Sequence, residues 1–205
     1  MTAVRLKKVF LIILSTISLH CFSQYKNEPC VTNVLRATFF DPGISYEKAM
    51  GTYQTVRARA FMATSFAFSY SSSFGTNTFI SIDPSLSLQY RYYYNYRKRS
   101  EKDKRTALNS LNYLAPSFTT SFSKSSISDS YNSEYNRRLI NSIGLVWGMQ
   151  RNYAKRFSLD LNLGAGYYFT TATVQANPSL TNKKHVDNFS TLGELSLGFW
   201  LNKRK

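Results

Sequence analysis

The stretch Ile80–Tyr96, with the sequence ISIDPSLSLQYRYYYNY, has the pattern that decides the fold. Its even positions are apolar or aromatic from Ile80 to Tyr96, while its odd positions hold mainly Ser, Asp, Gln and Arg. Successive side chains of a β-strand point to opposite faces. The pattern therefore predicts a long strand with one apolar face and one polar face.

The same alternation recurs elsewhere in the chain. Five further stretches show it, the last two less regularly: Val56–Tyr70, Phe157–Phe169, Phe189–Leu201, Leu114–Phe122 and Leu139–Met149. A turn signal at Asp41–Gly43 separates two more candidate strands, Thr32–Phe40 and Ile44–Met50. The sequence therefore predicts eight antiparallel strands.

Strand length and aromatic clustering separate two all-β architectures. A soluble β-sandwich would show the same alternation, with its apolar faces inward. However, tilted strands that cross a bilayer need about 9–11 residues, whereas strands of soluble proteins average about 5–6. Tyr90, Tyr92, Tyr94 and Tyr96 gather at one end of an apolar face, which is typical of an interfacial aromatic girdle. We therefore predict an all-β, eight-stranded antiparallel transmembrane β-barrel.

The first residues have the pattern of an export signal. Three basic residues between positions 5 and 8 precede the apolar run Val9–Leu19, and Cys21–Ser23 offers the residues that a signal peptidase recognises. A retained signal-anchor helix is the alternative, but this run is shorter than the ~17 residues that a span needs. The predicted organisation is a signal peptide over 1–23, a short segment over 24–32 and a barrel over 33–205. Together with the barrel pattern, it predicts the outer membrane of a Gram-negative bacterium.

Cleavage at this point has two consequences. It leaves Cys30 as the only cysteine, so no intramolecular disulfide can form. It also removes three basic residues and no acidic one, which lowers the net charge from +15 to +12. Nucleic acid is a poor partner for this charge, because an exported protein rarely meets it and the sequence has no basic helical face.

Basic residues concentrate in the connections at one end of the predicted hairpins. Arg97–Arg105 has six basic and two acidic residues, and Arg151–Arg156 and Lys203–Lys205 have three basic residues each. We name the predicted basic rim by five residues: Lys98, Arg99, Lys102, Lys104 and Arg105. Outer-membrane barrels have short periplasmic turns, so this rim is expected in the periplasm. It is either a solvated collar or a contact for anionic lipid or an acidic periplasmic partner.

The other end of the hairpins has longer connections. They are expected to be extracellular loops, with a possible external ligand, over Ser71–Thr78, Lys124–Arg138 and Thr171–Asn188.

The inward positions of the predicted strands carry charge. An eight-stranded barrel has room inside only for its own side chains or for one small ligand. Four cations and four anions face this lumen: Arg36, Arg57, Arg59, Arg91, Glu47, Asp83, Asp160 and Glu194. Unpaired buried charges cost several kcal/mol each, so we expect these groups to pair as a structural plug. A charged constriction or a ligand site is the functional alternative.

Three motifs carry a resemblance to a known family: Gln89–Asn95 with the basic turn after it, Leu163–Phe169, and Leu197–Asn202. They resemble the small bacterial outer-membrane β-barrel family of OmpA/OmpX-like architecture, over residues 33–205. The resemblance implies contact with outer-membrane lipids and with the barrel assembly machinery during insertion. Members that end in an aromatic residue present it to that machinery, whereas here four residues follow Phe199 and Trp200 before Lys205 is reached. The resemblance implies no activity, because most members have none assigned.

Residues suited to catalysis are sparse in the mature chain. Its one histidine, His185, is expected in a surface loop near Ser190, and one Cys with one His cannot make a zinc site of the usual type. We therefore predict a structural or surface-interaction barrel without catalytic residues, metal or cofactor. A narrow pore or carrier for a small molecule is the first alternative, and a lipid-modifying enzyme is the second.

Overall fold

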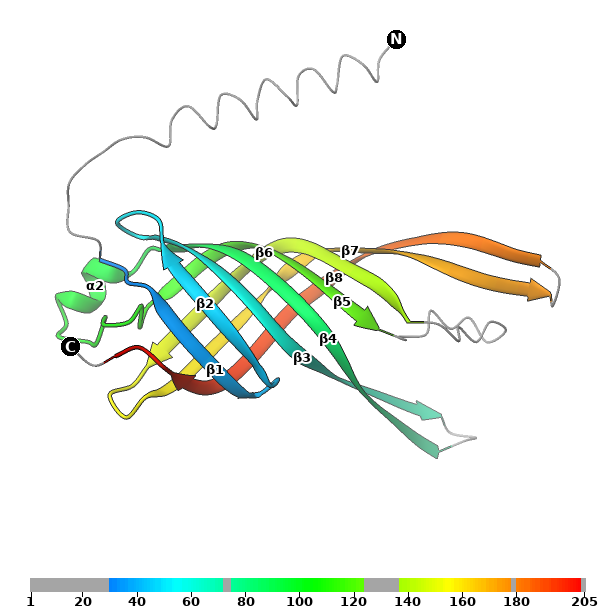
Figure 1. Ribbon diagram of the computed structural model, residues 1–205, viewed down its shortest axis with the longest axis horizontal. Helices are drawn as coiled ribbons and strands as arrows, with labels where there is room; N and C mark the ends of the chain where they lie inside the picture. The colour runs from blue at the N-terminus through cyan, green and yellow to red at the C-terminus, as the bar shows by residue number, and fades with distance from the viewer. Residues whose placement is uncertain (1–29, 72–74, 124–136, 178–179, 204–205) are drawn as a thin grey trace, which may run out of the picture.

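The fold is a closed β-barrel in the computed structural model, which describes residues 30–71, 75–123, 137–177 and 180–203. The strands follow one another around the ring in chain order, and β8 returns to pair with β1 (Figure 1). The elements are β1 (Val34–Phe40), β2 (Gly43–Ala49), β3 (Gln54–Ser71), β4 (Gly75–Tyr93), the short helix α2 (Tyr96–Ser100), β5 (Asn112–Ser123), β6 (Arg138–Asn152), β7 (Phe157–Asn177) and β8 (Leu180–Trp200). The predicted all-β, eight-stranded antiparallel barrel is confirmed. The predicted signal peptide lies outside the described residues.

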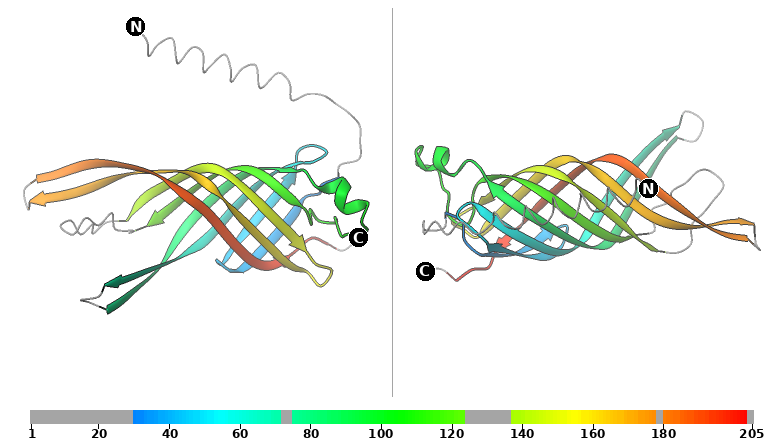
Figure 2. Two further views of the ribbon diagram at one scale, coloured as in Figure 1. Left: turned by 180° about the vertical axis from the view of Figure 1, so that it is seen from behind. Right: turned by 90° about the horizontal axis from the view of Figure 1, so that it is seen from above.

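The two ends of the barrel differ in shape. β1 and β2 have seven residues each, whereas β3 and β4 have 18 and 19, and β7 and β8 have 21 each. The β3–β4 and β7–β8 hairpins therefore project well beyond the wall at one end and diverge from each other there (Figures 1 and 2). The chain enters and leaves the barrel at the opposite end, beside α2.

The long connections were predicted wrongly where they are strand. The described residues of the predicted loop Thr171–Asn188 are strand and not loop, because β7 and β8 stay paired over 171–177 and 180–188, for example at Thr171 with His185. Ser71–Thr78 is likewise mostly strand, since β3 ends at Ser71 and β4 begins at Gly75. Apolar alternation stops in these stretches, but ladder hydrogen bonds between backbones need no apolar face. Most of the predicted Lys124–Arg138 loop lies outside the described residues.

The α2 end also corrects one predicted boundary. β4 ends at Tyr93, and Tyr96 belongs to α2, where its ring lies 6.0 Å from the ring of Tyr53. The alternation of β4 cannot extend to Tyr96, because the chain turns into a helix first. The described part of the predicted segment 24–32 packs against the barrel, since Val31 is fully buried and the Cys30 amide donates to the Thr52 carbonyl.

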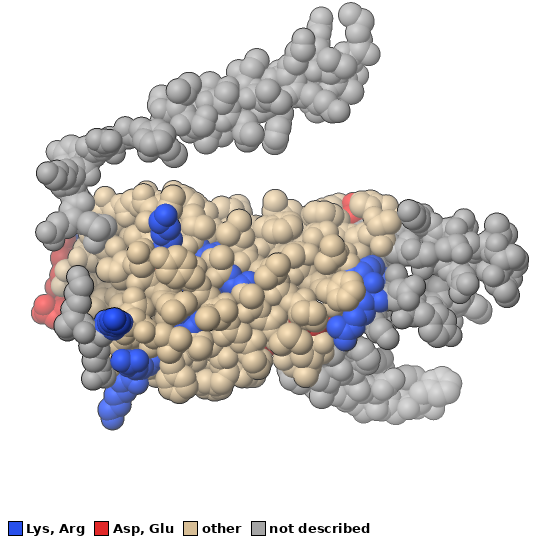
Figure 3. Space-filling model, viewed as in Figure 1, with Lys and Arg blue, Asp and Glu red and all other residues tan. Residues whose placement is uncertain are grey.

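The barrel wall has opposite polarity on its two faces. Along β4, the inward residues Ser85, Gln89 and Arg91 are buried, while Leu88 and Tyr92 on the outer face are about half exposed. Most large apolar side chains of the other strands also face outward, and the most exposed of them is Leu145 on β6. Figure 3 shows one side of this outer surface, where few charged side chains interrupt the wall. The polar core and apolar exterior invert the arrangement of a water-soluble domain.

Candidate functional site

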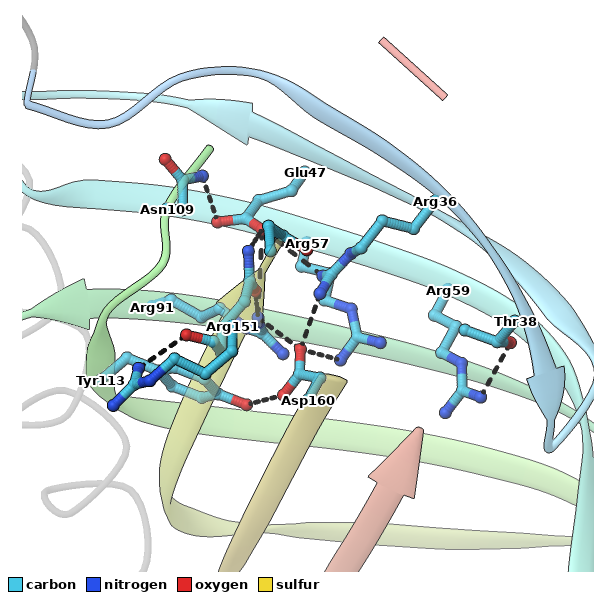
Figure 4. Close-up of polar contacts among 12 residues, drawn as sticks. Arg36, Thr38, Glu47, Arg57, Arg59, Arg91, Asn109, Tyr113, Arg151 and Asp160 are labelled. Atoms are coloured by element: carbon cyan, nitrogen blue, oxygen red, sulfur yellow. Dashed lines mark hydrogen bonds and ion pairs between the residues drawn. The ribbon is translucent and has the colours of Figure 1, made fainter. Parts of the chain in front are cut away.

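The candidate site is a network of charged side chains inside the barrel (Figure 4). Seven ion pairs among the described residues join seven of the predicted lumen charges, which we call the lumen ion-pair network: Arg36 on β1, Glu47 on β2, Arg57 and Arg59 on β3, Arg91 on β4, Asp160 on β7 and Glu194 on β8. The two-residue period of each strand turns them all inward. The network therefore connects strands from both halves of the sequence.

Asp160 is the most highly connected carboxylate of the network. Its Oδ2 lies 2.9 Å from Arg91 Nη1, 3.0 Å from Arg36 Nη1 and 3.5 Å from Arg57 Nη1. The Tyr113 hydroxyl donates a hydrogen bond of 2.7 Å to its Oδ1. Three guanidinium groups thus converge on one buried carboxylate, which is the arrangement expected for an anion that has left water.

Glu47 is completely buried and gathers neutral donors as well as cations. Its Oε2 lies 3.5 Å from Arg36 Nη2 and 3.9 Å from Arg91 Nη1. The hydroxyl of Tyr93 donates to its Oε1 at 2.6 Å, and the Asn109 side-chain amide donates to the same atom at 2.8 Å. Asn109 comes from the segment between α2 and β5, so this connection closes over the lumen.

Glu194 organises the part of the network nearer to the β1–β2 turn. It pairs with Arg57 at 3.4 Å and more closely with Arg59. Arg59 Nη2 also donates to the carbonyl of Asp41 in that turn, at 2.8 Å. The Arg59 guanidinium lies 4.1 Å from the centre of the Phe61 ring, which adds a cation–π contact.

Asp83, the eighth predicted lumen charge, lies outside the lumen ion-pair network. It is on β4, nearer than Arg91 to the start of the strand. Ser123 donates a hydrogen bond of 2.6 Å to its Oδ2, and the Asp83 side chain is buried. Nearby inward positions on β4 and β5 hold Ser85 and Ser121, whose hydroxyls are 2.7 Å apart. The lumen is therefore charged in the middle and lined with hydroxyl groups on this side.

An apolar cluster lies between the network and the α2 end. Its buried members come from the N-terminal segment, the α2–β5 connection and three strands: Val31, Tyr93, Leu111, Tyr113, Ala115 and Val146. The Tyr113 ring occupies the space beside Gly148, where an added Cβ would overlap it. Arg91 lies 4.0 Å above the same ring. This end of the lumen is therefore filled with side chains.

Sequence reasoning missed several neutral members of this site. Tyr93 and Tyr113 face inward by the same alternation that identified Arg91, so their positions in the strands could have predicted them. Gln150, fully buried on β6, donates to Glu47 at 3.2 Å and accepts from Arg91 at 2.6 Å, and it too lies at an inward position. Asn109 lies in an irregular connection, so no periodicity marks it.

The aromatic girdle is smaller than predicted. Tyr90, Tyr92 and Tyr94 face outward and are 45–46% exposed, and the Trp147 indole nitrogen donates to the Tyr94 hydroxyl at 2.6 Å. Tyr96 is displaced from this face, because it lies in α2. The aromatic girdle therefore contains three of the four predicted tyrosines, together with Trp147.

The predicted basic rim lies in and after α2. Lys98 and Arg99 belong to the helix, and Lys102, Lys104 and Arg105 follow it. All five are exposed except Arg99, which is partly buried. Arg105 donates through Nε to the Asn152 carbonyl at 2.6 Å, so this segment is tied to the end of β6.

The described residues contain no group of three or more His, Cys, Asp or Glu side chains suited to hold a metal ion. Within the same residues, no helix is long and apolar enough to cross a membrane. His185 is exposed, but the prediction that it lies in a surface loop was wrong, because it belongs to β8.

Comparison with known protein families, with curated proteins and with solved structures finds no match to the chain. A functional proposal therefore rests on the residues and on their geometry.

Proposed function

We propose that this chain is an outer-membrane β-barrel protein of structural or surface-interaction type, without catalytic activity. The observation that carries the proposal is the inverted polarity of the wall. Leu145, Leu163 and Phe189 are 57–70% exposed on the outside, while Arg36, Arg91 and Asp160 are at most 1% exposed inside. A water-soluble β-sandwich would place its apolar faces in the core.

A closed sheet is suited to a lipid environment. Every strand pairs with two neighbours, so the ladder leaves no free edge along the wall. Backbone groups within hydrocarbon must be paired in this way, because no water is present to bond them. Contiguous apolar surface larger than a few hundred Å² is rare on soluble monomers, whereas the outer face here is apolar around the ring.

The two ends support one orientation. The end with α2 and the basic rim fits the periplasmic side, where each Lys or Arg near anionic lipid contributes about 1 kcal/mol to binding. The long β3–β4 and β7–β8 hairpins then face outward, where an external ligand would meet them first. The signal peptide, assembly by the barrel machinery and kinship with OmpA/OmpX-like barrels belong to the same proposal.

The filled lumen favours a structural role over a narrow pore. The lumen ion-pair network crosses the interior, and the apolar cluster fills the end beside α2. Conduction through this interior would require several ion pairs to separate at once, each at a high desolvation cost. We therefore expect no steady single-channel current in planar bilayers.

Two measurements test the proposal. The protein should fractionate with the outer membrane, and its folded form should run differently from a boiled sample in a detergent gel, because a closed barrel resists detergent until it is heated. A chain that remains in the soluble fraction, with identical mobility before and after boiling, would contradict it.

A further inference from the structure

The lumen ion-pair network contains one more cation than anion. Four guanidinium groups meet three carboxylates, and six of these seven side chains are at most 2% exposed. The remaining buried charges of the described residues, Asp83 and Arg138, add one of each sign. Among these nine side chains one positive charge is therefore in excess, and the Asp41 carboxylate, which also interacts with Arg59, is only partly buried. Burial of an uncompensated charge is unfavourable.

Two of the four arginines flank a small residue in one row of the sheet. Ser45 on β2 pairs directly with Arg36 on β1 and with Arg59 on β3. Side chains of directly paired residues on one face start only about 4.5–5.5 Å apart. The row therefore places the Ser45 hydroxyl between the stems of two inward arginines.

Some hydrogen-bond donors around this row have no acceptor, even though the arginines form ion pairs. Arg36 and Arg59 use both Nη atoms on carboxylates, Thr38 and the Asp41 carbonyl (Figure 4). Among the described residues, the Nε atoms of Arg36 and Arg59 and the Ser45 hydroxyl have no hydrogen-bond partner. The Nε of Arg57, the next inward residue on β3, also has none. Each of these side chains is at most 2% exposed.

We propose that Arg36, Ser45 and Arg59 form a binding site for one small monovalent anion such as chloride. One negative charge balances the excess of one positive charge, and the spare donors come from three adjacent strands. Water would satisfy the donors but would leave the charge uncompensated. The site follows from the lumen geometry and does not require that the barrel span a membrane.

Unfolding in different salts tests the site on the unaltered protein. We expect the purified folded protein to unfold at a higher urea concentration in sodium chloride than in sodium gluconate of equal ionic strength. The gain should saturate with chloride, and at a hundred times its Kd the folding equilibrium constant should rise by about a hundredfold. Equal stability in both salts at every concentration would overturn the proposal.

Two variants of equal size separate charge from packing. Ser45→Asp puts a carboxylate into the row, whereas Ser45→Asn fills the same position without charge. We expect both to lose the chloride dependence, and the Asp variant to be the more stable of the two in gluconate. If the two variants are equally stable there, the interior has no excess positive charge to compensate.

Anomalous scattering decides the matter even if neither variant folds. Crystals of the unaltered protein grown in sodium bromide should show a bromide peak in contact with the Arg36 and Arg59 side chains. Water alone at that position would refute an anion site.

Discussion

The two faces of a single strand show how the wall is built. On β4, Arg91 points inward with no exposed surface, while Tyr90 and Tyr92 beside it point outward with 45% of their surface exposed. The inner face buries charge and the outer face exposes rings and aliphatic chains. The inner groups tolerate burial because they are paired, and under the proposed function the outer groups face lipid. The stability of this protein should therefore respond oppositely to charge on the two faces.

Removing one inner carboxylate should have the largest effect. Asp160→Asn keeps the size of the side chain but leaves Arg36, Arg57 and Arg91 without their shared anion. We expect a loss of about 3–5 kcal/mol in the free energy of unfolding, the usual result of leaving a buried ion unpaired. Urea unfolding of the folded barrel measures it. Asp187→Asn, at an exposed position on β8, is the matched control and should change stability little. Similar losses in both variants would mean that the network is not a closed, buried set.

Adding a charge to the outer face should have the next largest effect. Leu145 lies in the middle of β6 and is 70% exposed. In lipid, Leu145→Arg should lower the free energy of unfolding by about 2–4 kcal/mol, as expected for a cation near the bilayer midplane. Ala107→Arg, in the exposed connection before β5, serves as the control and should be nearly neutral. An unchanged stability for Leu145→Arg in vesicles would show that this face does not meet hydrocarbon.

The comparison of faces also shows what the sequence could reveal. Neighbouring residues of a strand face opposite sides, which is enough to place Arg91 inside and Tyr92 outside. The polarity of the wall, the number of strands and the inward charges could therefore be predicted from the alternation. The hairpin around His185 did not follow, since beyond the wall neither side of a strand needs to be apolar. Tyr96 was misplaced because nothing in the tyrosine run marks where the chain leaves the strand. The approach of Asn109 to Glu47 depends on the path of an irregular segment, and sequence periodicity carries no information about such a path.

Neutralising the basic rim should have the smallest effect on stability. Lys98, Arg99, Lys102, Lys104 and Arg105, all replaced by Gln, should leave the urea midpoint nearly unchanged, because exposed charges contribute little to folding. If this rim faces the periplasmic leaflet, the variant should retain less anionic phospholipid on purification, with a larger difference at low salt than at high salt. Labelling of a cysteine placed at position 102, in a Cys30→Ser background, reports the orientation. Efficient labelling from outside whole cells would place the rim on the wrong side for this role.

The two tryptophans of the chain offer the most direct test of the central claim, that the outer face lies in lipid and the inner face does not. Trp147 faces outward and is 41% exposed, whereas Trp200 is 5% exposed and its indole nitrogen donates to the Tyr153 carbonyl. The protein is inserted into vesicles whose phospholipids carry bromine on the acyl chains, because bromine quenches indole fluorescence on contact. The account predicts strong quenching of the Trp200→Phe variant, which retains Trp147, and weak quenching of the Trp147→Phe variant. Equal quenching of the two variants, or no quenching of Trp147, would contradict it.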